Sequence, residues 1–381
     1  MKCIVNGIIL TENSLLKNNA LIFGKKILDI IDEDLVSKNN FSEIINANGN
    51  YISPGFIDIH IHGCGGKDVM NGDLDSLKTI SKIIASKGTT SFLPTTMTMS
   101  KEKIYTSLNC IKSCMGKNIG GASILGANVE GPFISTKFKG AQNETFILKP
   151  NFKFIEPFKD VIKLMTIAPE EDYNLEFIKK VIESTNIILS IGHSNADYEK
   201  TIEAINIGIS HATHFFNGMP PFHHRNPGII GAIFNSNKVH VEVIADNIHV
   251  HKEALKMLLN IKGKDKVILI TDSMEAGCMH DGIWELGGQK VIVKNNSAHL
   301  ETGSLAGSIL TLNKAVKNIL DCTTLTINEA VNLASLNPAK ELKIDSQKGS
   351  IEINKDSDII IFDKNLDVKL TIVEGNTVFK I

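Results

Sequence analysis

The sequence has no apolar run long enough to cross a membrane. Its apolar stretches, such as residues 267–271 (VILIT), stop far short of the roughly 20 residues that span a bilayer. The N-terminus also lacks the features of a secretory leader, because Asn6 and Gly7 interrupt it before an apolar segment forms and no small-residue cleavage site follows. We therefore expect no transmembrane helix, no membrane partner and a cytoplasmic location.

Clusters of basic residues are equally absent. Lysine and arginine number 40 against 42 aspartates and glutamates, so the formal charge is −2, and no run of five or more basic residues occurs. Without a basic patch the chain has no electrostatic footprint for nucleic acid or an anionic membrane surface. We expect a small-molecule partner and no nucleic acid.

Cysteine is sparse for a chain of this length. Six cysteines spread over 381 residues do not form a disulfide framework, and a reducing compartment would keep them as thiols. Cys110 and Cys114 lie four residues apart on one face of a predicted helix. A redox pair is therefore an alternative there to two packing thiols.

The residues that are present predict a barrel. Apolar residues make up 43% and charged residues 22%, the balance of an ordinary globular protein. From about residue 55, short apolar runs alternate with amphipathic helical patterns, such as residues 74–88 with Gly88 as the C-cap glycine, which indicates parallel βα units. We count eight such runs, at residues 56–60, 90–95, 124–130, 162–168, 187–193, 210–214, 239–246 and 267–272. The expected fold class is α/β, with a closed (β/α)8 or TIM barrel.

The two flanks of the chain have a different pattern. Residues 1–53 and 347–381 alternate apolar and polar positions in short strands with Gly and Asn turns. Neither flank can bury a core alone, so we expect the two to pair into one small β-sandwich domain. The predicted division is residues 1–53 and 347–381 for this domain and 54–346 for the barrel.

Residues that can bind a metal fall at the C-terminal ends of the predicted strands. A single histidine or carboxylate at such a position is more often structural, but here the residues come from five different strands, whose C-terminal ends meet at the mouth of a barrel. They are His60 and His62 at the end of the first run, then Glu130, His193, His214 and Asp272 at the ends of later runs. Their joint placement predicts an open, catalytic metal site.

The ligand types suit a pair of transition-metal ions. His60 and His62 lie two residues apart, so on a strand both rings point to one side. Glu130 can bridge two ions, and His193 with His214 would complete the second one. Imidazole with carboxylate favours Zn or Fe, with Co or Mn as alternatives, over Mg or Ca. Two such ions can share a hydroxide as the nucleophile and polarise an amide carbonyl. Asp272 would act as general base and then general acid.

Several longer segments together resemble a known family. They are PGFIDIHIHG (54–63), NVEGPFIS (128–135), IGHSNADY (191–198), THFFNGMPPFHHRNPG (213–228), ADNIHVH (245–251), ITDSMEAG (270–277) and LAGSILTL (305–312). In this order they resemble the N-acetylglucosamine-6-phosphate deacetylase family of the amidohydrolase superfamily, over nearly the whole chain. The resemblance implies hydrolysis of N-acetylglucosamine 6-phosphate to glucosamine 6-phosphate and acetate, in amino-sugar catabolism.

The resemblance also implies roles for individual residues. The metal ligands would be His60, His62, Glu130, His193 and His214, and Asp272 the acid and base. Some relatives lack the first two histidines and use one ion, so keeping both predicts two divalent ions per subunit.

For the substrate, Arg225 would bind the phosphate, and Asn217 and Gly218 would contact the same ligand. His249 matches a residue that reaches the phosphate from a neighbouring subunit, which implies a homodimer. Gln142 stands where some relatives carry a histidine, so we expect it to bind substrate without exchanging a proton. Asp58 would support the site without binding metal.

Other functions stay open from the sequence. A different amidohydrolase activity would use the same metal ligands. The alternatives are an N-acetylgalactosamine-6-phosphate deacetylase, a dihydroorotase-like amidase and an acylamino-acid deacetylase. The segment around Arg225 favours a sugar phosphate among these. A non-catalytic barrel that binds sugar phosphates would have no use for Asp272.

Overall fold

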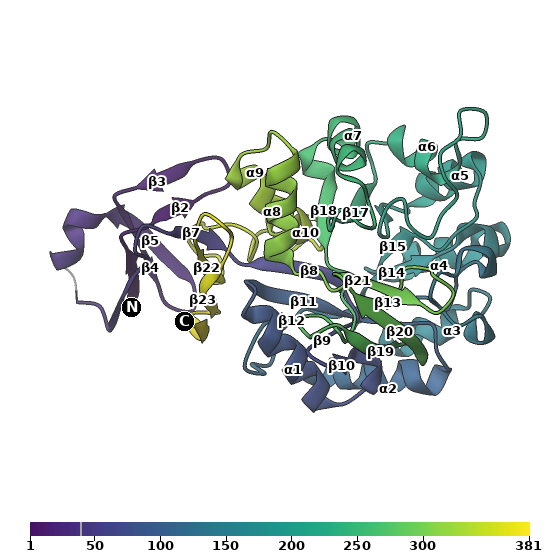
Figure 1. Ribbon diagram of the computed structural model, residues 1–381, viewed down its shortest axis with the longest axis horizontal. Helices are drawn as coiled ribbons and strands as arrows, with labels where there is room; N and C mark the ends of the chain where they lie inside the picture. Colours follow the sequence, from purple (N-terminus) through teal and green to yellow (C-terminus); the bar gives the residue numbers. More distant parts are fainter. Residues whose placement is uncertain (39) are drawn as a thin grey trace.

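The computed structural model describes residues 1–38 and 40–381, and its centre is a barrel of parallel strands (Figure 1). Each strand pairs in parallel with the next one along the chain, and a bridge between Ile61 and Ser273 joins the last strand region to the first. The strands are β8 (Phe56–Ile61), β11 (Thr89–Thr96), β13 (Ala127–Glu130), β14 (Ile162–Ile167), β15 (Ile188–Ile191), β16 (His211–Ala212), β17 (His240–Ile244) and β18 (Val267–Ile270). Every predicted run overlaps one of them, which confirms the predicted (β/α)8 barrel.

The barrel strands are buried on both faces. All residues of β8, β11, β13 and β18 are buried, because one face packs inside the barrel and the other packs under helices. This explains their continuous apolar and β-branched runs, such as VILI in β18. The polar residues that interrupt these runs, among them Asp58, His60 and Glu130, are buried too and mark where the interior carries chemistry.

Helices cover the outside of the barrel. α1 begins after Asp73, whose carboxylate accepts a hydrogen bond from the Ser76 backbone N–H at 2.8 Å, and buries Leu77 and Ile80. It ends at Ala85, before the predicted Gly88, which lies in the following turn with φ +89°. The helices are α1 (Leu74–Ala85), α2 (Lys101–Cys114), α3 (Phe152–Ile155), α4 (Glu176–Ser184), α5 (Tyr198–Ile207), α6 (Gly228–Phe234), α7 (Lys252–Lys262), α8 (Leu312–Cys322), α9 (Ile327–Asn332) and α10 (Leu336–Glu341).

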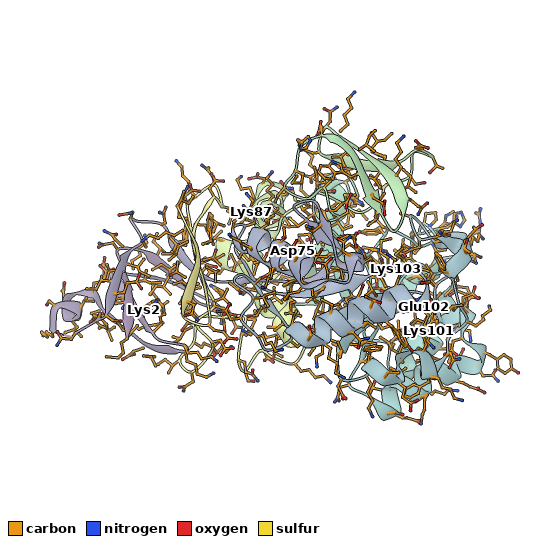
Figure 2. The ribbon with its side chains drawn as sticks, turned by 90° about the horizontal axis from the view of Figure 1, so that it is seen from below. Lys2, Asp75, Lys87, Lys101, Glu102 and Lys103 are labelled. Carbon is orange, nitrogen blue, oxygen red and sulfur yellow. The ribbon has the colours of Figure 1, made fainter. Side chains whose placement is uncertain are left out.

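The outer faces of these helices are charged. Figure 2 shows Asp75 on α1 and Lys101, Glu102 and Lys103 at the start of α2 on the outside of the barrel, where all four are exposed. None of the described helices combines the length and apolar content that a membrane crossing needs.

The two ends of the chain form a separate pair of sheets beside the barrel (Figure 1). One sheet has the order β5-β4-β1-β6, and the other has the order β24-β23-β22-β7-β2-β3, so it joins strands from both flanks. A shared apolar core, including Ile4, Phe23, Ile52 and Ile372, draws residues from both sheets. The strands are β1 (Lys2–Val5), β2 (Ile8–Leu10), β3 (Leu15–Lys17), β4 (Asn19–Phe23), β5 (Ile27–Asp32), β6 (Glu43–Asn46), β7 (Tyr51–Pro54), β22 (Ile359–Phe362), β23 (Val368–Val373) and β24 (Asn376–Lys380). The pairing of the flanks is as predicted, while the domain boundaries at 53/54 and 346/347 stay a prediction.

Two smaller sets of strands were not predicted. A three-stranded antiparallel sheet follows β18 and consists of β19 (Gly282–Leu286), β20 (Gln289–Lys294) and β21 (Ser297–Leu300). Short strands β9 (Gly63–Cys64) and β10 (Lys67–Asp68) form a hairpin after β8, and β12 (Ser123–Ile124) pairs with β11. The sheet β19–β21 contributes Leu286 to the wall of the pocket described next.

Candidate active site

The six predicted metal-site residues meet at the C-terminal mouth of the barrel. The Nε2 atoms of His60 and His62 lie 3.3 Å apart, and those of His193 and His214 lie 3.1 Å apart. All four histidines are buried. Two groups of ligand atoms are close enough to hold a metal ion, one formed by His60, His62 and Glu130 and the other by Glu130, His193 and His214.

Glu130 is shared by both groups. Its Oε1 lies 3.0 Å from the Nε2 atoms of both His193 and His214, while its Oε2 lies 3.2 Å from Nε2 of His62. Asp272 faces the first group, with Oδ1 3.2 Å from Nε2 of His62. A carboxylate with Oε1 toward His193 and His214 and Oε2 toward His62 has the geometry of a bridging ligand.

The other ring nitrogen of each histidine is held by a hydrogen bond that points away from the mouth. The Nδ1 atoms of His62, His193 and His214 donate to the backbone carbonyls of Thr95 (3.2 Å), Phe138 (2.8 Å) and Asn217 (3.1 Å). Nδ1 of His60 lies 2.9 Å from the carboxylate of Glu242. These bonds place the proton on Nδ1 and leave the Nε2 lone pair of every ring free for a metal ion.

Three of the site residues have an unusual backbone conformation. His193, His214 and Asp272 have φ of +46°, +27° and +49°, in a backbone region that residues other than glycine rarely adopt. Such strain persists where surrounding contacts impose it, and it gathers at functional sites. Here the strained turns follow β15, β16 and β18 directly.

The electrostatics of the cluster favour positive charge at the Nε2 atoms. Burial alone would raise the pKa of Glu130, but His193, His214 and His62 hold it well below its usual range. Burial would lower the pKa of His62, but hydrogen bonds to Asp272 and Glu130 raise it well above normal. The two carboxylates therefore stay ionised and attract a cation, and a divalent ion can replace the protons that they hold on the imidazoles.

A pocket of 150 Å³ opens onto this cluster. Besides the metal-site residues, it is lined by four of the five predicted substrate residues, namely Gln142, Asn217, Gly218 and His249. Gly218 has φ +64°, and a Cβ there would lie 3.0 Å from Nδ1 of His193, so only glycine fits this close approach. The chemistry and the predicted binding groups thus share one cavity.

Comparison with known proteins agrees with this geometry. The model of the amidohydrolase family matches residues 51–378. This chain belongs to the amidohydrolase family. It is 38% identical to the N-acetylglucosamine-6-phosphate deacetylase of Bacillus subtilis strain 168, over 97% of this chain and 95% of that one. It is also 39% identical to the enzyme of that name from Lysinibacillus sphaericus, over 87% and 86% of the two chains.

Other matches extend the comparison to structure and to a related activity. The crystal structure of N-acetylglucosamine-6-phosphate deacetylase from Pasteurella multocida superposes with a TM-score of 0.92 at 30% identity, over 99% of each chain. The N-acetylgalactosamine-6-phosphate deacetylase of Escherichia coli O157:H7 is 31% identical over 96% of each chain. The amidohydrolase fold and the family are therefore shown over the full length of the chain.

In this amidohydrolase, Gln142 contacts the shared carboxylate directly. Its Nε2 donates to Oε2 of Glu130 at 2.6 Å, and its Oε1 accepts from the Thr98 backbone N–H at 2.7 Å. These two bonds fix which end of the amide faces the cluster. One N–H of the Gln142 amide has no acceptor among the described residues and faces the pocket that it lines.

His249 and Arg225 lie in different surroundings. Asp246 accepts hydrogen bonds from Nδ1 of His249 (2.7 Å) and from its backbone N–H (2.8 Å), which turns the ring toward the pocket of its own chain. The expectation that His249 acts across a subunit boundary stays a prediction. Arg225 is exposed and does not line the pocket, and its Nη1 lies 3.0 Å from Nε2 of His224.

The sequence analysis placed Asp58 near the site and missed Glu242. The Asp58 carboxylate accepts from Oγ1 of Thr271 at 2.6 Å, consistent with a supporting role. Glu242 lies inside β17 and contacts both His60 and the backbone N–H of His214. A glutamate between two valines of a predicted barrel strand was the available signal, because such a charge is rarely buried without a partner.

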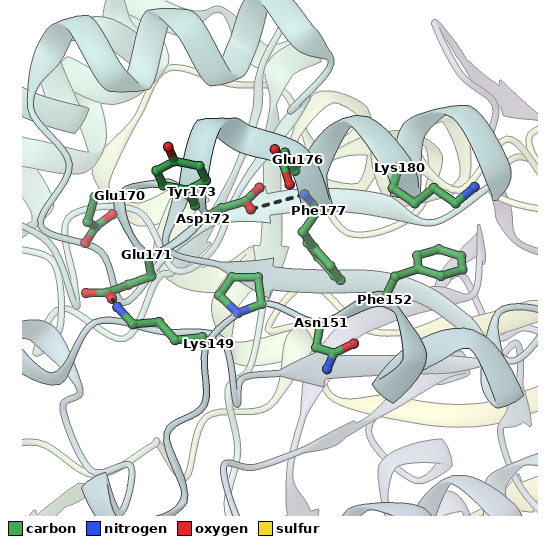
Figure 3. A pocket seen from close by; sticks show the side chains of 11 residues that line it. Lys149, Asn151, Phe152, Glu170, Glu171, Asp172, Tyr173, Glu176, Phe177 and Lys180 are labelled. Carbon is green, nitrogen blue, oxygen red and sulfur yellow. Dashed lines mark hydrogen bonds and ion pairs between the residues drawn. The ribbon is translucent and has the colours of Figure 1, made fainter.

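A larger hollow of 600 Å³ lies elsewhere on the surface and carries none of this chemistry (Figure 3). Lys149, Phe152, Tyr173 and Lys180 surround it. Its buried acid, Asp172, accepts from the backbone N–H groups of Phe177 and Ile178 at the start of α4, so it serves as a helix cap.

Proposed function

We propose that this amidohydrolase hydrolyses N-acetylglucosamine 6-phosphate to glucosamine 6-phosphate and acetate. The observation that carries the proposal is the pair of histidine groups sharing Glu130, with Asp272 facing one of them in the same pocket. The substrate class comes from the relatives. Two of them are named N-acetylglucosamine-6-phosphate deacetylase, and they align with 97% and 87% of this chain.

The donor set fits two divalent ions. His60, His62 and Glu130 would hold one, and Glu130, His193 and His214 the other, with Asp272 as a further ligand on the first side. Zn or Fe suits these nitrogen and oxygen donors best, and Co or Mn is an alternative. When bound, the ions supply Lewis acidity toward the amide carbonyl and lower the pKa of water to about 7.

The protein's own groups carry the proton. Asp272 is 8% exposed. Burial would raise its pKa, but His62 and His60 lower it, which favours the ionised carboxylate. It accepts a proton from the attacking water and delivers it to the departing amine nitrogen, which is otherwise a poor leaving group. Gln142 holds Glu130 in place and offers its remaining N–H to the substrate oxygen.

The remaining pocket residues would bind the sugar phosphate. Gly218 and Asn217 lie beside His193 and His214, where the Asn217 backbone N–H donates to the His214 carbonyl at 2.9 Å, and His249 lines the same pocket. Arg225, whose planar guanidinium suits a phosphate, is assigned to the phosphate by the family motif. Its exposed position outside the pocket of its own chain accords with the predicted homodimer, which stays a prediction along with the cytoplasmic location.

A second candidate is deacetylation of the galactosamine epimer. The relative from E. coli O157:H7 at 31% identity carries that name. Both substrates need the same metal site and the same acid and base, so the pocket's polar groups at the sugar hydroxyls would decide between them.

The test is an acetate-release assay on purified protein with four substrates. These are N-acetylglucosamine and N-acetylgalactosamine, each with and without the 6-phosphate, alongside elemental analysis of the protein. We expect the highest kcat/KM for N-acetylglucosamine 6-phosphate and two divalent ions per chain. No acetate release from any of the four, with metal bound, would reject the deacetylase proposal.

A further inference from the structure

A chain of buried ionisable groups extends from the metal site into the interior of the barrel. Oε2 of Glu242 lies 2.9 Å from Nδ1 of His60, and its Oε1 lies 3.1 Å from Nε2 of His211. Nδ1 of His211 lies 2.9 Å from Oε1 of Glu341. His60, His211 and Glu242 are fully buried, and Glu341 is 6% exposed. The four groups come from β8, β17, β16 and α10, so only the folded barrel brings them together.

The hydrogen-bond partners assign the protons in this chain. A carboxylate oxygen accepts and does not donate, so a histidine placed between two carboxylates must carry a proton on each ring nitrogen. His211 is therefore an imidazolium. Burial would lower its pKa, but the hydrogen bonds that it donates to Glu242 and Glu341 raise it to about 9, in agreement with this assignment.

Glu242 also contacts one residue from each of the two groups of metal-binding side chains. The same Oε2 that accepts from His60 accepts from the His214 backbone N–H at 3.0 Å. His214 has the strained φ of +27°, and its ring belongs to the second group. One carboxylate oxygen thus fixes the ring of a ligand on one side and the backbone of a ligand on the other.

Burying this many charges would be a poor way to gain stability alone. Taking each ion out of water costs several kcal/mol, and a buried ion pair often contributes no more than apolar residues of similar volume. A role in orienting the site accounts for the arrangement, since the partner of a metal-binding histidine sets its tautomer and raises its basicity.

We propose that Glu242 positions His60 for metal binding, and that His211, itself hydrogen-bonded to Glu341, holds Glu242 in place. Glu242, His211 and Glu341 are positioning residues in this scheme, and none of them touches substrate. The inference rests on the metal-binding role proposed above for His60.

The test compares Glu242→Gln with Glu341→Gln in the full-length protein. Gln at 242 keeps the volume, its oxygen can accept from His60 and His214, and its amide can donate to a His211 that has lost its Nε2 proton. Metal affinity is measured on the stripped proteins by competition with a chelator, using Co²⁺ and Zn²⁺ as probes. We expect E242Q to bind the ion at His60 and His62 about 10–100-fold more weakly. We expect E341Q, the same exchange two residues further along this chain of contacts from His60, to lose less.

A second readout needs no variant. Long-range ¹H–¹⁵N spectra of the histidine rings in the metal-free parent should show both nitrogens of His211 protonated at neutral pH, and His60 as the Nδ1–H tautomer. A neutral His211, or metal affinity in E242Q equal to that of the parent, would overturn the inference. Failure of the parent itself to bind divalent ions would instead overturn the proposed metal-dependent function.

Discussion

Replacing Asp272 by asparagine should separate proton transfer from metal binding. The backbone at this position is held independently of the side chain, because its N–H donates to the His60 carbonyl at 2.9 Å and its carbonyl accepts from Ser308 at 2.7 Å. Asparagine has the same size, and its oxygen can take the position of Oδ1, 3.2 Å from Nε2 of His62. We therefore expect Asp272→Asn to fold and to retain its metal ions.

The magnitude follows from the two steps that one carboxylate serves. A positioned acid or base contributes about 10²–10⁴-fold, and here the same group would act at water and at the leaving nitrogen. We expect kcat to decrease by about 10³–10⁴-fold, in the upper part of that range. This decrease corresponds to an activation free energy higher by about 4–5.5 kcal/mol. The amide cannot hold and release a proton at any accessible pH, so raising the pH should not restore the rate.

The assay is acetate release from N-acetylglucosamine 6-phosphate, with elemental analysis of the same preparation. Asp58→Asn is the matched control, because Asp58 is a buried carboxylate near the site that bonds Thr271 and does not line the pocket. We expect that variant to lose stability but to keep far more of its kcat. A fully metallated Asp272→Asn with kcat within tenfold of the parent would refute the acid and base role.

The remaining predictions concern the ions, the phosphate and the small β unit. Removing metal with a chelator should abolish acetate release, and divalent ions should restore it; activity that persists in metal-free protein would contradict the mechanism. Arg225→Ala should raise KM for the phosphorylated substrate and leave the unphosphorylated one unchanged, whereas an equal loss on both would remove its phosphate assignment. Lys348 is buried between Asp358 (2.7 Å) and Asp356 (3.1 Å), so Lys348→Met should lower the free energy of unfolding by about 3–5 kcal/mol near pH 7, measured by urea denaturation. Lys25→Met, at an exposed ion pair, is the control and should cost about 0–1 kcal/mol; equal effects would be inconsistent with burial as the cause.

The pH dependence of the Lys348 effect has a definite sign. Burial would lower the pKa of Lys348, but Asp358 and Asp356 raise it. A raised lysine pKa stabilises the fold fully below the unfolded pKa of 10.5, and this contribution is lost as pH rises through the folded value. At the acid end, the loss caused by Lys348→Met should shrink as the pH falls toward the pKa of Asp358, which burial raises, because the protonated Asp358 carboxyl no longer needs a cation beside it.

Patterns local to the chain were sufficient to predict the barrel and the cluster of histidines and carboxylates at its mouth. Each strand leaves its own apolar run in the sequence, and parallel strands must point their C-terminal ends to one mouth. His60, Glu130 and Asp272 follow such runs directly, so their meeting could be deduced without a structure. The pairing of the flanks followed from the same patterns, since neither flank can bury a core alone.

Tertiary structure alone decided how these residues are held. The contact between His60 and Glu242 spans 182 residues, and the contact between His211 and Glu341 spans 130, so no short-range pattern could pair them. The amide of Gln142 likewise depends on Glu130 and Thr98, which lie 12 and 44 residues away in the chain. Apolar periodicity determines which residues are buried, but hydrogen bonds between distant segments determine where buried polar atoms point.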